Sequence, residues 1–214
     1  MKRAFTMAEV LITIGVVGLI AALTIPQLIE GYQKKETVTR LKRSYTLIQQ
    51  AIRMAEGEND EFKYWDFSLK GEAFFERYLA KHFNHPIIIS TSDLNKKVKR
   101  KNLNGTAYYG STYDGSDTVN FLTNDGSLIT INLNSSIDEG LWVGIDTNGL
   151  ANPNVMGRDT FLFFFSPEKG LQPLGKEGTL NRNSWQCENC TRGDFMSNKK
   201  TAATKQMRAT GALP

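Results

Sequence analysis

An apolar run close to the N-terminus is the strongest constraint on what this 214-residue chain can fold into. From Phe5 to Ile25 the only ionisable side chain is Glu9, and most other residues are valine, leucine, isoleucine, alanine or glycine. A helix needs about 20 consecutive apolar residues to span a bilayer. The run therefore predicts a spanning helix, whereas the remainder, rich in asparagine, serine, threonine and glycine, predicts a domain in water.

Two ordinary explanations of this run each leave a feature unexplained. A secretory signal has about 7–15 apolar residues and then a small-x-small cleavage site, but the run is at the long end of that range and offers only the poor candidate Ile20-Ala21-Ala22. A plain anchor does not account for Glu9, because a charge at the bilayer centre costs about 2.5–3.5 kcal/mol. Glu9 either lies near enough to the interface to be solvated or has a positive partner.

The residues around Glu9 match a known pattern. The leader Lys2-Arg3-Ala4 and the following Phe5-Thr6-Met7-Ala8-Glu9-Val10-Leu11-Ile12 resemble the cleavage site of type IV prepilins and type II secretion pseudopilins. The resemblance implies that a prepilin peptidase cuts between Ala4 and Phe5 and methylates the Phe5 amine. It also implies that Glu9 acts in assembly and that Pro26 bends the helix. Ala4 departs from the glycine that usually precedes the cut.

The function implied is that of a structural subunit of a type IV pilus or of a type II secretion pseudopilus. Such a subunit crosses the bacterial inner membrane once before assembly and lies in a periplasmic or cell-surface filament afterwards. The implied partners are the prepilin peptidase, other pilin or pseudopilin subunits, the inner-membrane assembly platform and the lipid bilayer. The alternative is a signal-anchored periplasmic binding or sensing domain that does not polymerise.

Enzymatic and nucleic-acid functions find little support in the residues. An anchored hydrolase would need a catalytic constellation, but the chain has no Ser–His–Asp grouping, phosphate-binding loop or HExxH motif, and only two histidines. The net charge of +4 falls to +2 without Lys2 and Arg3 of the predicted leader. No nucleic-acid motif accompanies that charge, so we expect neither catalysis nor a specific nucleic-acid partner.

Beyond Pro26 the sequence predicts that the helix continues to Glu56, giving a length of about 75 Å from Thr6. Apolar residues recur at steps of three and four, as expected for a helix with one buried face: Val38, Leu41, Tyr45, Ile48, Ile52 and Ala55. Gly57 is a stop signal. The basic residues off this stripe, such as Arg40 and Arg43, are interpreted as a solvated face, with pairing between subunits as the alternative.

The remaining residues predict an α+β head over residues 57–190 and a polar tail over 191–214. Together with the leader, 1–4, the spanning helix, 5–25, and its amphipathic extension, 26–56, they complete the predicted domain organisation. The head should contain an antiparallel sheet of about four strands packed on the second half of the long helix. The segments that indicate it are a helix over Leu69–Phe83, a hairpin over Asp117–Asn134 with an Asp-Gly turn, and strands at Leu141–Ile145 and Thr160–Phe165. The basic segment Lys96–Lys101 is interpreted as an exposed loop.

Two sets of head residues are candidate sites. Asp146, Asn148 and Asp159 lie in a loop rich in oxygen ligands that resembles half of a calcium loop, although the acidic ligand twelve positions along is missing. Asx turns explain the same residues without a metal. Cys187 and Cys190 are spaced as a redox pair, half of a zinc site or a local disulfide. An oxidising compartment favours a local disulfide or thiols without a role, and of these the disulfide is the prediction here.

Overall fold

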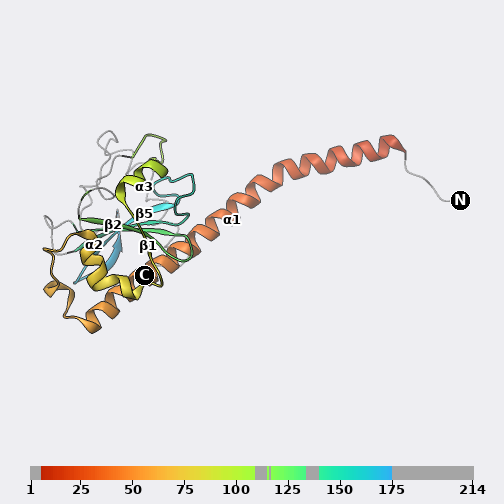
Figure 1. Ribbon diagram of the computed structural model, residues 1–214. Helices are drawn as coiled ribbons and strands as arrows, with labels where there is room; N and C mark the ends of the chain where they lie inside the picture. Colours follow the sequence, from red (N-terminus) through yellow and green to blue (C-terminus); the bar gives the residue numbers. More distant parts are fainter. Residues whose placement is uncertain (1–5, 109–114, 116, 134–139, 175–214) are drawn as a thin grey trace. The chain divides into compact units, whose positions relative to one another are not determined.

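The computed structural model describes residues 6–108, 115, 117–133 and 140–174. A long N-terminal helix is followed by a six-stranded antiparallel sheet, which confirms an α+β fold with a long N-terminal helix (Figure 1). The chain divides into two compact units, residues 1–39 and residues 40–214.

Helix α1 (Met7–Glu58) is a single helix of 52 residues that runs through Pro26 without a break. From Met7 to Tyr32 its large apolar side chains are exposed, with Leu11, Val17 and Leu23 each between 65% and 69% accessible. Of the described helices, this one alone is long and apolar enough to cross a membrane, a test that signal sequences also pass. The bend expected at Pro26 stays a prediction.

The ends of α1 correct the predicted range by one or two residues. Thr6 precedes the helix instead of belonging to it, and the helix continues past Gly57 to Glu58. The main-chain N–H of Asn59 and its side-chain Nδ2 both donate to the Ala55 carbonyl oxygen, each at 2.9 Å. The helix therefore ends one residue past Gly57, inside the predicted stop segment 57–60, and the Asn59 side chain caps its last turn.

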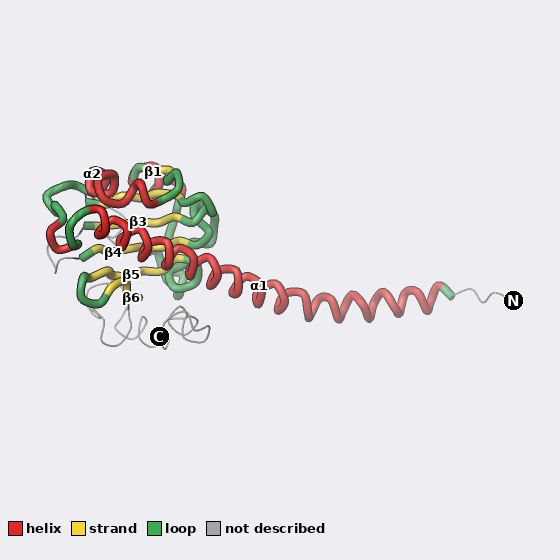
Figure 2. The backbone as a smooth tube through the Cα atoms, turned by 90° about the horizontal axis from the view of Figure 1, so that it is seen from below, coloured by secondary structure: helices red, strands yellow, loops and turns green. Residues whose placement is uncertain are grey.

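The head is built on a sheet in which each strand pairs with the next along the chain (Figure 2). The strands are β1 (Ile87–Ile89), β2 (Thr118–Leu122), β3 (Leu128–Asn132), β4 (Leu141–Asp146), β5 (Thr160–Ser166) and β6 (Gly170–Pro173). The predicted hairpin is the β2–β3 pair, and Gly126 in its turn has a φ of +80°, which favours glycine. The expected four strands are present, and β1 and β6 extend the sheet at its two edges.

One face of the sheet packs on the part of α1 that belongs to the head. Ile48, Ile52 and Ala55 are at most 2% exposed and share a core with the sheet. The residues that β2 to β5 contribute alternate along each strand: Val119, Phe121, Ile129, Ile131, Leu141, Val143, Ile145, Phe161, Phe163 and Phe165. The predicted seam between the helix and the head is therefore confirmed.

The predicted helix over Leu69–Phe83 is present as three consecutive helical pieces. They are α2 (Gly71–Phe74), the π-helical η2 (Phe75–Leu79) and the 3₁₀ turn η3 (Ala80–His82), preceded by a further 3₁₀ turn, η1 (Phe62–Tyr64). The two phenylalanines at the junction of α2 and η2 are fully buried in the main core. A Cβ at Gly71 would lie 2.7 Å from the Thr118 backbone, so only glycine allows the segment to start directly on β2.

The basic segment Lys96–Lys101 differs from the exposed loop that the sequence predicts. Its first two lysines end helix α3 (Thr91–Lys97), which a side-chain cap from Ser90 begins. Val98 and Arg100 are then buried while the lysines between and after them are exposed. The sequence does not reveal this arrangement, because the lysines hide the alternation of buried and exposed positions in an extended chain.

Candidate functional sites

The first candidate site is the start of α1. Glu9 Oε2 accepts hydrogen bonds from the Thr6 N–H at 2.8 Å and from Thr6 Oγ1 at 2.9 Å, and Thr6 Oγ1 accepts from the Glu9 N–H at 3.2 Å. This reciprocal pair is a capping box, which satisfies donors that the first helical turn would leave unpaired. The sequence signal of this capping box is the Thr-x-x-Glu spacing from Thr6 to Glu9. Solvation and a charge partner, the two explanations of Glu9 drawn from the sequence, do not include this spacing.

The capping box gives Glu9 a role in the single chain that is separate from any charge partner. Because glutamine can also close a capping box, exchanging Glu9 for glutamine separates the capping role from the charge. Ala4 and Phe5, the residues of the predicted cleavage, lie outside the described residues, as do Cys187 and Cys190. The cleavage, the methylation and the disulfide therefore stay predictions.

The second candidate site is the loop between β4 and β5 together with the two strand residues that flank it, residues 146–160. Asp146 and Asp159 stand at its two ends and are 1% and 5% exposed. Asn148 joins them, because its N–H donates to Asp146 Oδ1 and its Nδ2 donates to Asp159 Oδ2, each at 3.3 Å. The structure thus brings together the three residues predicted to bind calcium.

Hydrogen bonds within the protein already engage both carboxylates. Thr160 Oγ1 donates to Asp146 Oδ2 at 2.9 Å, and the Val155 N–H donates to Asp159 Oδ1 at 2.5 Å. The bond from the Asn148 N–H to the Asp146 side chain is an Asx turn. The Asx-turn geometry that explains these residues without a metal is therefore present.

The charge on Asp146 is costly in this loop. Burial raises the pKa of Asp146 to about 7, and the neighbouring Asp159 carboxylate also raises it. The hydrogen bond from Thr160 and the charge of Arg100 act in the opposite direction but do not outweigh these effects. A proton or a cation at Asp146 would relieve the cost.

Two amide oxygens are further candidate cation ligands in this loop. Asn148 Oδ1 and Asn154 Oδ1 are buried and have no hydrogen-bond partner among the described residues, and Asn154 is 0% exposed. Unpartnered buried amide oxygens are uncommon, and calcium takes both carboxylate and amide oxygens. The described residues hold no group of three or more His, Cys, Asp or Glu suited to a metal ion, so a cation here would need the asparagines.

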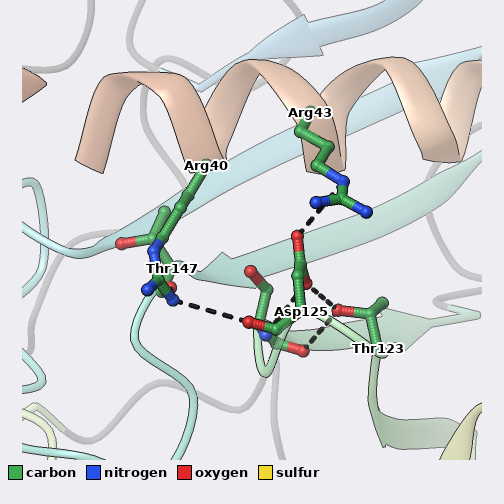
Figure 3. A network of polar contacts seen from close by, with 6 residues as sticks. Arg40, Arg43, Thr123, Asp125 and Thr147 are labelled. Atoms are coloured by element: carbon green, nitrogen blue, oxygen red, sulfur yellow. Dashed lines mark hydrogen bonds and ion pairs between the residues drawn. The ribbon is translucent and has the colours of Figure 1, made fainter. Parts of the chain in front are cut away.

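A third cluster lies where α1 meets the head (Figure 3). Arg43 Nε lies 3.5 Å from Asp125 Oδ2, and the same carboxylate accepts hydrogen bonds from Thr123 Oγ1 at 2.5 Å and from the Ser127 N–H at 3.2 Å. Burial acts to raise the pKa of Asp125, but these hydrogen bonds and the Arg43 charge outweigh it, so the pKa lies below its ordinary value.

Arg40 belongs to the same cluster and is half-buried. Its Nη1 donates to the carbonyl oxygens of Thr147 and Asp125 at 3.3 and 3.5 Å. The interpretation as a solvated face is therefore wrong for Arg40, whereas Arg43 is exposed, as that interpretation expects, although its guanidinium lies near Asp125. The sequence carries no signal for the Arg40 contact, since carbonyl oxygens are available in every loop.

The class of protein that these features define is an α+β domain carried on a long helix whose first part is apolar and exposed. The chain belongs to a family of unknown function, DUF6613, whose model matches residues 27–206. That match covers the head and leaves out residues 1–26, which carry the resemblance to prepilins. No curated protein and no solved structure matches the chain, and nothing in these comparisons indicates the pilin family.

Proposed function

We propose that this chain is a structural filament subunit of the type IV pilin or type II secretion pseudopilin kind. The observation that carries the proposal is the continuity of α1. One helix begins at the Thr6–Glu9 capping box beside the prepilin-like junction, exposes its apolar side chains, and then supplies a face of the head's core. A subunit that polymerises through its helix and displays its head requires this order.

The exposed apolar surface of the first unit needs a cover. Apolar patches of this extent mark a membrane or protein contact. Lipid supplies the cover before assembly, with the helix spanning the bacterial inner membrane, and the helices of other subunits supply it in a periplasmic or cell-surface filament. Gly15 and Gly18 have open space where a Cβ would stand, which permits close approach of a neighbouring helix in either setting.

The partners of such a subunit are the prepilin peptidase, other pilin or pseudopilin subunits and the assembly platform in the inner membrane. We propose no catalytic activity, since the arrangement described is one of packing surfaces. The competing function is a signal-anchored sensing domain, for which the helix would need only apolar residues and no acidic residue in its first turn.

The filament proposal is tested by shearing cells that carry the peptidase, an assembly platform and this chain. We expect the chain in the sheared, sedimenting fraction and, after mild cross-linking, in ladders of multimers. Retention of the whole population in the membrane as monomers, with the platform active on its own subunits, would favour the anchored sensing domain.

For the loop between β4 and β5 we propose calcium as the ligand, held by Asp146, Asn148 and Asp159 with the addition of Asn154. Two buried amide oxygens without a partner, in the same loop as two buried carboxylates, favour this ligand. Excess calcium at a hundred times its dissociation constant should stabilise the head by about 2.7 kcal/mol.

The measurement is the melting temperature of the protein with calcium and after chelation. We expect the chelator to lower it and calcium to restore it, and Asp159→Asn to remove most of the response. An identical melting temperature at every calcium concentration would leave the Asx turns as the whole explanation of these residues.

A further inference from the structure

Arg40 joins parts of the head that are far apart in the sequence, as Figure 3 shows. One guanidinium nitrogen, Nη1, donates to the carbonyl oxygen of Asp125 in the β2–β3 turn and to that of Thr147, which directly follows β4. A single side chain of helix α1 therefore holds a hairpin turn and the first residues of the candidate calcium loop at once.

The turn and the loop also touch through their backbones. Gly149 has a φ of +67°, and a Cβ at this position would clash with the Gly126 carbonyl oxygen. Only glycine fits this contact. The turn cannot shift toward the loop without moving it, so the two carbonyl groups that Arg40 binds belong to segments in direct backbone contact.

Thr147 connects the Arg40 contact to the candidate ligands. Its N–H and Oγ1 both donate to the Asp159 carbonyl oxygen, at 2.9 and 3.1 Å, and Thr147 is 1% exposed. Asp146 and Asn148, its neighbours in sequence, are candidate ligands themselves. The peptide groups that position the candidate ligand residues therefore also position the Thr147 carbonyl oxygen that Arg40 binds.

We propose that Arg40 couples the calcium loop to helix α1, so that calcium bound in the loop suppresses opening of the helix where it enters the head. The inference rests on the calcium proposal above and not on filament assembly. Asp146 and Asn148 would hold the calcium on either side of Thr147, which would fix the Thr147 peptide, and the Arg40 guanidinium would then have two fixed acceptors. Arg43 contacts the turn alone, through the Asp125 carboxylate, and among the described residues it has no contact with Thr147.

Hydrogen exchange followed by mass spectrometry tests the coupling on the full chain in detergent micelles, with calcium chloride or a chelator. In the wild type we expect calcium to slow exchange in peptides from residues 146–160 and, by about five-fold or more, in peptides from residues 40–47. Arg40→Gln should keep the protection of the loop and lose that of the helix. The matched control Arg43→Gln should keep both.

The outcomes separate the two levels of the proposal. Loop protection without any change at residues 40–47 in the wild type, or helix protection that survives Arg40→Gln, overturns the coupling while leaving the calcium site intact. No protection of the loop overturns the site and the coupling with it, and leaves the filament proposal untouched. If Arg40→Gln does not fold, Arg40→Lys keeps the charge and should show a reduced response of the helix; an undiminished response would contradict the coupling.

Discussion

Glu9→Ala is expected to give a folded, membrane-resident and correctly processed chain that enters filaments poorly. Glu9 lies outside the head, so the core on α1 and the β2–β3 hairpin should not change. In the membrane the exchange removes a charge that is expensive to bury. In a filament it would strand the Phe5 amine among packed helices, which costs about 3–5 kcal/mol as for one partner of a buried ion pair.

Because of the capping box, Glu9→Gln is the variant that separates the charge of Glu9 from its capping role. Glutamine keeps an acceptor for the Thr6 N–H but carries no charge, so its incorporation into filaments should be nearly as poor as that of Glu9→Ala. The fraction of this chain in sheared filaments is the quantity to compare, with Thr6→Ala as the matched control that removes the hydroxyl group from the capping box and keeps the charge. Normal incorporation of Glu9→Gln, combined with failure of Thr6→Ala, would assign Glu9 to capping alone.

The stability of the head without calcium should fall as the pH rises from about 4 to about 7. The pKa of Asp146 is about 7 in the folded head against an ordinary value of 3.8. Between these values the folded state holds a proton that the unfolded chain has released, so raising the pH favours unfolding. The stability that this proton supplies is complete below the ordinary pKa, is lost as the pH passes the folded pKa, and amounts to about 4 kcal/mol.

Asp146→Asn should remove this dependence, because the amide keeps the shape of the protonated acid and does not titrate. We expect its melting temperature to equal that of the wild type at pH 4 and to lie well above that of the wild type at pH 8, with a chelator present in all samples. Asp125→Asn is the control of opposite sign. The pKa of Asp125 is depressed, so its stabilising effect is present above its ordinary pKa and this exchange should destabilise the head at neutral pH. Equal pH profiles of wild type and Asp146→Asn would contradict the assignment.

The parts of the fold that the sequence predicts well are those with a strong local signal. The apolar stripe of α1 and the Asp-Gly turn of the β2–β3 hairpin each follow from a periodic pattern or a turn residue. The edge strands were missed for the opposite reason. β1 has only three residues, and β6 begins with Gly170 and ends with Pro173, residue types that indicate turns.

The candidate sites likewise divide into features that a local sequence pattern indicates and features that only the folded structure creates. The spacing of Asp146, Asn148 and Asp159 was visible because calcium loops have a sequence pattern. The burial of Asn154 and its φ of +50° were not visible, since both arise from the folded loop. Arg40 was assigned to solvent because its partners are backbone carbonyl groups brought close only by the packing of α1 on the sheet.

The central claim is that this chain is processed as a filament subunit, and the mass of its N-terminal peptide tests that claim most directly. The protein is to be purified from cells that contain a prepilin peptidase and then digested. The account predicts a chain that begins at Phe5 and carries one added methyl group on its terminal amine. A chain that begins at Met1, or one cut after Ala22 as an ordinary secretory signal would be, would contradict it.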